Sequence, residues 1–359
     1  MTKPRARDLG IPFEGTPGEY NAITDVAGVT VGYATVIEND SARTGVTIIH
    51  PRGRDDHDPA FAGWFPFNGN GEMTGSAWVE EGGFLEGPIG ITNTHSVGIV
   101  RDTIIQWQVE HSHIFQGWSC PLVAETADGW LNDINAFFVK PEHVLHALNS
   151  AGSGPIEEGN VGGGTGMLCY EFKGGTGTSS RKLPEKFGGW TVGALAQTNF
   201  GRRFQLTIAG VPVGQHLKQD SVLTSGENPF KQDDGSLIVI LATDAPLLPH
   251  QLKRLAKRAS LGMARTGSLG GNGSGDIFLA FSTANPNAAL GDKDGLASIQ
   301  ALSNNFIDPL LMSSVYATEE AIVNSMIAAE DMTGYRGVSA KALPHEKLRE
   351  IMKQYNRIR

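Results

Sequence analysis

The clearest pattern in the chain is an uninterrupted run of apolar residues from Leu237 to Ala242. A strand with one solvated face alternates apolar and polar side chains, whereas a run without alternation is typical of a strand buried on both faces. Shorter stretches that are β-branched and partly alternating predict further strands. They occupy residues 29–36, 44–50, 88–95, 192–199, 204–209 and 277–281, and a turn at Gly201 joins the fourth to the fifth.

Apolar residues that recur every three or four positions predict helices in the remaining segments. Pro141 suits a first helical turn and Gly152 a helix end, and Pro249 begins another helix with an apolar face and a basic face. The helices lie at about residues 97–107, 141–151, 249–263, 315–330 and 344–356. Because no low-complexity linker interrupts these elements, the sequence predicts a single α/β or α+β domain over residues 1–359.

Composition narrows the class of protein. A formal charge of −9, a pI near 5.6 and the lack of any basic run argue against a nucleic-acid partner. No apolar segment reaches the length of a membrane span or follows the basic N-terminus as a signal would, so we expect a cytoplasmic protein with no membrane partner. The 46 glycines follow no period and indicate tight turns and close backbone approach. Cys120 and Cys169 lie among apolar residues and are predicted to be buried thiols without a disulfide.

Several familiar signatures are absent. Two glycine-rich segments, residues 160–167 and 174–180, lack the pattern of a phosphate-binding loop and predict sharp hairpins or close-packed strands. Histidine occurs with acidic residues at 55–58 and with a second histidine at 111–113, but the spacing supplies no complete ligand set. The sequence also lacks the common zinc motifs and the Gly-x-Ser-x-Gly elbow of α/β-hydrolases. We therefore expect no metal and no cofactor.

A serine stands where a polar segment meets the long apolar run. Ser236 follows Gly235 and the polar residues 227–234. Glycine followed by serine is common turn chemistry, so the pair alone does not separate a turn from a reactive site. Other small polar residues stand at the ends of predicted strands, and they are Asn199, Ser274 and Asp276. This set suits a serine nucleophile that works without histidine, because an N-terminal amine with a pKa of about 7.7–8.0 can act as the base.

Long stretches of the sequence resemble the family of the L-aminopeptidase D-Ala-esterase/amidase and the β-peptidyl aminopeptidases. The similarity covers nearly the whole chain and is strongest in residues 4–10, 12–18, 21–26, 158–167 and 243–247. The resemblance implies a four-layer α-β-β-α sandwich of the N-terminal-nucleophile type. It also implies a precursor that cleaves itself between Gly235 and Ser236, which gives an α chain of residues 1–235 and a β chain of residues 236–359. The αβ units are expected to assemble into a homotetramer.

The resemblance also implies roles for individual side chains. Ser236 takes the place of the nucleophile, and Ser274 with Asp276 corresponds to the pair that orients it. Asn199 matches the side-chain amide of the oxyanion hole. Glu125 matches the acid that receives the free amine of the substrate.

The chain departs from the family pattern in two places. Asp276 replaces the glutamate of the β-peptidyl members and is one methylene shorter, which leaves its reach to Ser274 open. Ala127 and Trp130 occupy a stretch where some members have a tyrosine, which leaves the shape of the acyl pocket open.

Together these patterns predict a serine aminopeptidase or amidase. It would release N-terminal residues from short peptides, amides and esters through an acyl-enzyme on Ser236. One alternative is a self-cleaving acyltransferase of similar architecture, which passes the acyl group to an amine. Another is a non-catalytic glycine-rich binding protein in which Gly235 and Ser236 form an ordinary turn.

Overall fold

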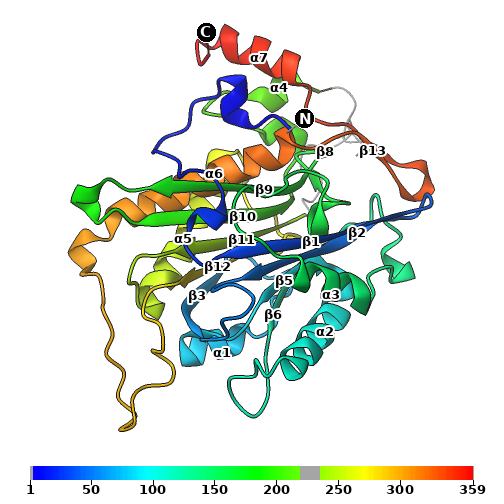
Figure 1. The fold of residues 1–359 in the computed structure, drawn as a ribbon. Coiled ribbons are helices and arrows are strands. Elements are labelled where there is room, and N and C mark those ends of the chain that lie inside the picture. Colours follow the sequence, from blue (N-terminus) through cyan, green and yellow to red (C-terminus); the bar gives the residue numbers. More distant parts are fainter. Residues whose placement is uncertain (1–2, 219–234, 359) are drawn as a thin grey trace.

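The apolar run that dominates the sequence forms a strand in the interior of a six-stranded sheet (Figure 1). A computed structural model describes residues 3–218 and 235–358 of the chain. Strand β11 (Ser236–Thr243) pairs in antiparallel fashion with β10 (Thr191–Asn199) and in parallel with β12 (Ile277–Ser282). The sheet has the order β4-β3-β12-β11-β10-β9, in which β3 is Ala60–Pro66, β4 is Phe84–Leu85 and β9 is Gly175–Lys182.

A second sheet of four strands packs against the first. Its order is β1-β2-β5-β6, and the strands are β1 (Thr30–Glu38), β2 (Ala42–His50), β5 (Ile89–Asn93) and β6 (Leu122–Thr126). Strands β5 and β6 are parallel, and helix α2 (Val97–Glu110) follows β5 in the connection between them.

Successive side chains of β11 enter two different layers of the core, as the period of a strand requires. Leu237, Val239 and Leu241 pack with the apolar faces of α5 (Pro249–Arg265) and α6 (Asp308–Ile327). Ile238 and Ile240 pack between the two sheets. Helix α2 and α3 (Pro141–Asn149) cover the other face of the four-stranded sheet. The predicted α-β-β-α sandwich is confirmed (Figure 1).

The remaining elements are short and lie at the edges of the sandwich. They are helices α1 (Ser76–Gly82), α4 (Val213–His216) and α7 (His345–Gln354), the hairpin of β7 (Leu168–Cys169) with β8 (Phe172–Lys173), and the hairpin of β13 (Met332–Thr333) with β14 (Ser339–Ala340). Across residues 3–218 and 235–358, no helix has the length and apolar character needed to cross a membrane.

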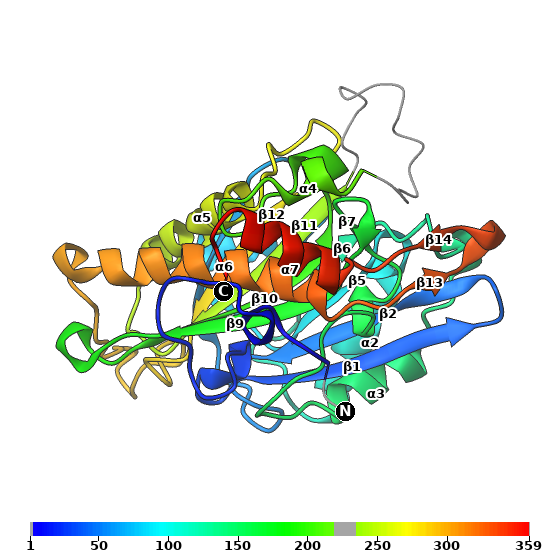
Figure 2. The ribbon, with the colours of Figure 1, turned by 90° about the horizontal axis from the view of Figure 1, so that it is seen from above.

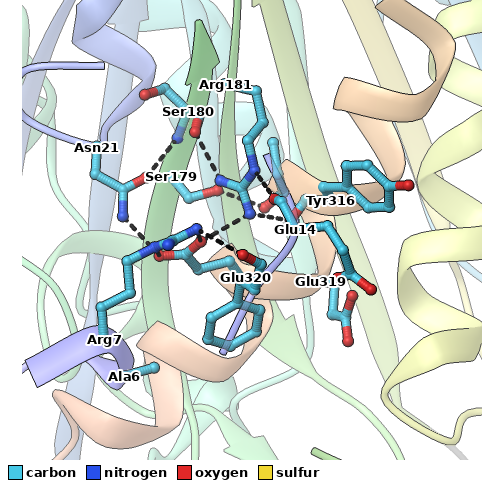
Figure 3. Close-up of polar contacts among 12 residues, drawn as sticks. Ala6, Arg7, Glu14, Asn21, Ser179, Ser180, Arg181, Tyr316, Glu319 and Glu320 are labelled. Carbon is cyan, nitrogen blue, oxygen red and sulfur yellow. Dashed lines mark hydrogen bonds and ion pairs between the residues drawn. The ribbon is translucent and has the colours of Figure 1, made fainter. Parts of the chain in front are cut away.

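Ion pairs to a buried glutamate join the N-terminal segment to α6, which runs across β9 and β10 (Figures 2 and 3). Arg7 Nε lies 2.8 Å from Glu320 Oε1, and Arg181 Nη2 of β9 lies 2.7 Å from Glu320 Oε2. Asn21 Nδ2 donates a further hydrogen bond to the same carboxylate, at 2.6 Å. Glu320 is fully buried, so α6 and the N-terminal segment share one desolvated charge cluster.

The structure contradicts the strand predicted at residues 204–209. A 3₁₀ turn at Arg203–Gln205 replaces its beginning, and only Ile208 makes an isolated bridge, to Val211. Ala209 and Gly210 both have positive φ, as in a tight type I′ turn. The buried side chain of Arg203 donates to the carbonyl oxygens of Tyr170 and Leu217 and so holds the chain away from a sheet.

Two further expectations need correction. The first glycine-rich segment contains a 3₁₀ turn at Gly162–Gly164 rather than a hairpin or strand. Glycine is required there by close approach, since a Cβ at Gly164 would lie 2.3 Å from Thr176 N. The second segment lies in β9 and is close-packed, as predicted. Cys169 is buried, but Cys120 is exposed, because it lies in the loop before β6 rather than in the strand.

Candidate active site

Ser236 is the first residue of β11, and it faces Asn199 at the end of β10. Its exposed fraction is 5%. The residue before it is confined by the neighbouring strand, because a Cβ on Gly235 would lie 2.2 Å from Asn199 O and 2.5 Å from Phe200 Cα. Glycine is therefore the residue that this close approach allows at position 235.

The turn that precedes β12 presents one backbone amide to the Gly235–Ser236 peptide bond. Gly275 N donates to Ser236 Oγ at 3.2 Å and to Gly235 O at 3.2 Å. Its own position excludes a side chain, because a Cβ there would lie 2.5 Å from Asn70 O. An N–H group held in this way can stabilise negative charge that develops on a carbonyl oxygen.

The residues on either side of Gly275 form a buried hydroxyl–carboxylate pair. Ser274 Oγ donates to Asp276 Oδ1 at 2.8 Å, and both side chains are almost completely buried. Asn68, just after β3, donates from Nδ2 to Asp276 Oδ2 at 2.8 Å and accepts a hydrogen bond from Asp276 N through its own Oδ1. Both oxygens of the carboxylate are therefore hydrogen-bonded. The same contacts fix the turn that carries Gly275.

The amide of Asn199 is held at both ends by backbone groups. Asn199 Oδ1 accepts from Leu168 N at 2.9 Å, and Asn199 Nδ2 donates to Ala127 O at 2.8 Å. These contacts distinguish the oxygen of the amide from its nitrogen. The second N–H of Nδ2 is not used by either contact.

Glu125 lies on β6 with an exposed fraction of 2%. Its Oε1 accepts from Glu72 N at 3.0 Å, and its Oε2 accepts a short hydrogen bond from Thr94 Oγ1. Burial raises the pKa of this carboxyl group, while the hydrogen bonds from Thr94 and the Glu72 amide lower it. The net shift is upward, so the carboxylate is one that gains from a cationic partner.

Gly71 connects the two halves of the site. A Cβ at Gly71 would lie 3.0 Å from Gly275 Cα and 3.2 Å from Glu125 Oε1, so the acid and the turn beside Ser236 lie on either side of this glycine. All five side chains predicted from the sequence, Glu125, Asn199, Ser236, Ser274 and Asp276, therefore lie in one region of the fold. Their chemical roles remain predictions.

Comparison with known proteins gives this constellation a context. The model of peptidase family S58 matches residues 21–340, a span that includes all five side chains. This chain belongs to peptidase family S58.

Named S58 relatives match the chain along almost its full length. The beta-peptidyl aminopeptidase BapA of Sphingosinicella microcystinivorans is 50% identical over 99% of this chain and 93% of its own. The protein of the same name from Sphingosinicella xenopeptidilytica is 47% identical over 98% of this chain and 92% of its own.

Solved structures agree with the sequence matches. The L-aminopeptidase D-Ala-esterase/amidase of Ochrobactrum anthropi, described as a prototype of the serine aminopeptidases and a variant of the Ntn hydrolase fold, superposes with a TM-score of 0.92 at 49% identity, covering 99% of this chain and 100% of that one. A β-aminopeptidase of a Burkholderia species superposes with a TM-score of 0.88 at 46% identity, covering 98% and 99%. The N-terminal-nucleophile type of fold, predicted from the resemblance, is confirmed.

Sequence reasoning missed several groups in this S58 site. Asn68, Thr94 and the backbone amide of Gly275 each contact one of the predicted side chains. A signal for Asn68 was present, because the turn sequence at residues 68–71 alternates asparagine and glycine directly after an apolar stretch. A backbone donor such as Gly275 N has no signature of its own in a sequence.

The two segments weighed as metal ligands lie outside the S58 site. Residues 54–57 are exposed, and His57 stacks on His113 with the ring centroids 5.0 Å apart. Within the part of the chain that the structure describes, no three histidine, cysteine, aspartate or glutamate side chains gather in a metal-binding arrangement.

Proposed function

We propose that this S58 chain is a self-processing serine aminopeptidase that acts on short peptides, amides and esters with a free N-terminal amine. The observation that carries the proposal is the position of Gly275 N, 3.2 Å from both Ser236 Oγ and Gly235 O. One donor thereby serves the nucleophile and the carbonyl group that the nucleophile would attack. An ordinary turn has no need of this arrangement.

The processing step follows from that geometry. Ser236 Oγ attacks the carbonyl carbon of Gly235, and the charge that develops on Gly235 O is stabilised by the Gly275 amide. The peptide C–N bond breaks, the hydroxyl proton passes to the departing nitrogen, and an ester joins the two residues. Water then hydrolyses the ester, which releases the Gly235 carboxylate and restores the hydroxyl of Ser236. The products are residues 1–235 and 236–359, as the sequence predicts.

The same groups support turnover of a substrate. The new α-amine of Ser236, with an ordinary pKa of about 7.7–8.0, accepts the proton from Oγ as the hydroxyl attacks the substrate carbonyl. Gly275 N–H and the second N–H of Asn199 Nδ2 stabilise the oxyanion. The leaving amine or alcohol takes up the proton, and water hydrolyses the acyl-enzyme. The Ser274–Asp276 pair holds the turn that aims Gly275.

Glu125 supplies recognition of the substrate amine. Its buried carboxylate accepts hydrogen bonds from the Thr94 hydroxyl and the Glu72 amide, which are both uncharged donors. Burial disfavours the ionised form of Glu125, and the positive charge of a substrate ammonium group would stabilise it. The names of the relatives supply the substrate class. They describe a β-peptidyl aminopeptidase and an L-aminopeptidase with D-Ala esterase and amidase activity, and both match nearly the whole of this chain.

The decisive experiment compares the wild type with Ser236→Ala. The denatured wild type should run as two chains whose masses correspond to cleavage after Gly235, whereas Ser236→Ala should stay whole and inactive. Ser260→Ala on α5, which removes a hydroxyl outside the site, is the matched control and should be cleaved and active. A processed Ser236→Ala protein, or an uncleaved wild type with full activity, would refute the mechanism. Product analysis with an added amine acceptor separates hydrolysis from acyl transfer.

We extend the proposal to assembly and location. The resemblance to self-cleaved aminopeptidases supports a homotetramer of αβ units. The sequence patterns described above support a cytoplasmic location and a site without cofactor or metal. Light scattering of the purified protein tests the tetramer, and a stable αβ unit of single mass would contradict it. Fractionation of the source cells tests the location.

A further inference from the structure

The orientation of the Asn199 amide depends on two peptide units, one on each side. Leu168 N donates to Oδ1 at 2.9 Å, and Ala127 O accepts from Nδ2 at 2.8 Å. Rotation of the amide by half a turn would place its oxygen where the oxyanion forms. Whatever fixes these two peptide units therefore fixes the donor that the reaction uses.

A buried lysine holds the first peptide unit. The carbonyl of Met167 and the N–H of Leu168 belong to the same peptide plane, and Lys173 Nζ donates to Met167 O at 2.9 Å. The ammonium group also donates to Gly174 O at 2.8 Å and to Gly164 O at 3.3 Å. Three donors thus meet three carbonyl oxygens, and a continuous chain of hydrogen bonds runs from Nζ through the peptide plane to Asn199 Oδ1.

A buried aspartate holds the second peptide unit. Asp128 directly follows Ala127, and its Oδ1 accepts from Asn132 Nδ2 at 3.0 Å. Its backbone carbonyl also accepts from the amides of Leu131 and Asn132, at 3.1 and 3.0 Å. Ala127 is exposed, whereas Asp128 has an exposed fraction of 0%. The buried side chain of Asp128 therefore fixes the backbone that leaves Ala127.

Among residues 3–218 and 235–358, neither side chain has the ion partner that normally accompanies a buried charge. Burial lowers the pKa of Lys173 to about 7 and raises that of Asp128 to about 7, with the side chains of Thr44, Asn132 and Asn93 opposing the second shift. In the part of the chain described by the structure, no salt bridge involves either residue. Ionisable groups buried in this way cost stability, and their presence next to a reactive site points to a task there.

We infer that Lys173 and Asp128 are positioning residues that fix the amide of Asn199, so that the second N–H of Nδ2 points at the substrate carbonyl oxygen. The inference rests on the proposed function, because it assigns the two side chains to the oxyanion hole of that reaction. They act through Met167–Leu168 and Ala127, and neither of them touches the substrate.

The test is a double-mutant cycle with Asn199→Ala. Lys173→Met removes all three donors and should lower kcat by about tenfold to a hundredfold with KM nearly unchanged, because the lost contact is formed in the transition state. In the Asn199→Ala background the same change should lower kcat by less than about twofold, because the group that Lys173 positions is already absent. Lys173→Gln keeps N–H donors and should recover part of the loss.

Asp128→Asn supplies a second arm that disturbs folding less, because the amide oxygen can still accept from Asn132. It too should lower kcat in the wild type and have little further effect in Asn199→Ala. Gln251→Met on α5 is the matched control. The hydrogen-bond partners of its side chain are Leu248, Leu302 and Asn304, none of which belongs to the site, so the change should lower the melting temperature without changing kcat.

The outcomes separate the two proposals. If Asn199→Ala leaves kcat unchanged, the oxyanion role of Asn199 in the proposed function fails. If Asn199→Ala lowers kcat but Lys173→Met and Asp128→Asn lower it by the same factor in both backgrounds, the positioning role fails while the proposed function stands. If Lys173→Met does not fold, the cycles with Lys173→Gln and Asp128→Asn decide by the same criterion.

Discussion

At the scale of single residues, Asp276 makes a contact with Ser274 that the length of its side chain left open in the sequence. The carboxylate reaches Ser274 Oγ at 2.8 Å, and its other oxygen is held by Asn68 at 2.8 Å. The methylene lost relative to glutamate does not break the contact with Ser274. Asn68 reaches the carboxylate from the end of β3 and also accepts from the Asp276 amide, so the turn is fixed through two kinds of contact.

The first prediction concerns the effect of the Glu125 charge on kcat/KM. Glu125→Gln keeps the shape of the side chain and removes its charge, so it should lower kcat/KM for substrates with a free amine by about tenfold to a hundredfold. Self-cleavage involves no free amine and should proceed normally in this variant. Glu80→Gln changes an exposed acid on α1 and should leave kcat/KM unchanged. Equal turnover of N-acetylated and free substrates by the wild type would remove Glu125 from the site.

The same residue predicts a pH dependence. Burial raises the pKa of Glu125, so the carboxylate that binds the ammonium is lost as the pH falls through a value above the ordinary one. The acidic limb of the kcat/KM profile for free-amine substrates should therefore be displaced to higher pH than for an exposed glutamate. Glu125→Gln should lack this contribution to the limb.

At the scale of elements, the sequence predicts the strands and helices whose apolar pattern is strong. Strand β11 and helices α3, α5 and α7 agree with the prediction within a few residues, whereas α6 begins seven residues before position 315, at Asp308. Strand β3 was not predicted, because small residues such as Gly63 weaken its pattern. They are required there, since a Cβ on Gly63 would lie 2.4 Å from Lys253 N of α5.

The candidate site also contains groups that the sequence predicts and groups that it does not. Side chains with distinctive chemistry, such as Ser236 and Asn199, stand out at the ends of strands and could be proposed from the sequence. Gly275 N could not, and the turn signal at residues 68–71 gives Asn68 no partner, because both contributions depend on which loops the fold brings together. Strand β3, which the sequence does not predict, pairs with β12 and brings Asn68 to the turn at Gly275. Without β3 in the prediction, the contact of Asn68 with Asp276 could not be foreseen.

Glu320 joins α6 to the N-terminal segment and to β9, and we predict that its charge contributes to the stability of the fold. Burial opposes its ionisation, but the contacts with Arg7 and Arg181 prevail and hold the pKa of Glu320 below its ordinary value (Figure 3). A group of this kind contributes stability above its unfolded-state pKa and loses that contribution as the pH falls through the folded-state pKa. Glu320→Gln leaves the buried guanidinium group of Arg181 and the partly exposed one of Arg7 without their partner, and it should reduce the free energy of unfolding at pH 7 by about 3–5 kcal/mol.

Urea denaturation measures this effect, and the Ser236→Ala background should keep the chain in one piece. The difference in stability between the proteins with and without the Glu320→Gln change should shrink as the pH falls through the ordinary glutamate pKa of about 4.3, because the unfolded chain then takes up a proton at Glu320 before the folded chain does. Glu346→Gln on α7 changes an exposed acid and is the control, with no expected difference. A difference in stability that stays constant from about pH 7 to about pH 3 would show that charge is not its cause.

At the scale of the whole molecule, the site stands at the junction of the two proposed chains. The strands after Ser236, β11 and β12, lie between β10 and β3, which both precede it in the sequence. Each proposed chain thus supplies strands to the six-stranded sheet, which neither chain can complete alone, whereas the four-stranded sheet lies entirely before Ser236. The residues of the site also come from both sides of the proposed cut, with Glu125 and Asn199 before it and Ser274 and Asp276 after it.

This interleaved order of strands gives the proposed cut a consequence for refolding. Before cleavage the sheet assembles within one molecule, so Ser236→Ala should regain its structure after dilution from denaturant at a rate independent of protein concentration. After cleavage the same sheet requires two fragments to meet, so recovery of the mature enzyme should be second order and should fail when the fragments are dilute or aggregate. A mature enzyme that refolds as readily as Ser236→Ala at nanomolar concentration would contradict this. Once cut, the enzyme would persist because of the height of its unfolding barrier, as a structure that it assembled once and does not readily assemble again.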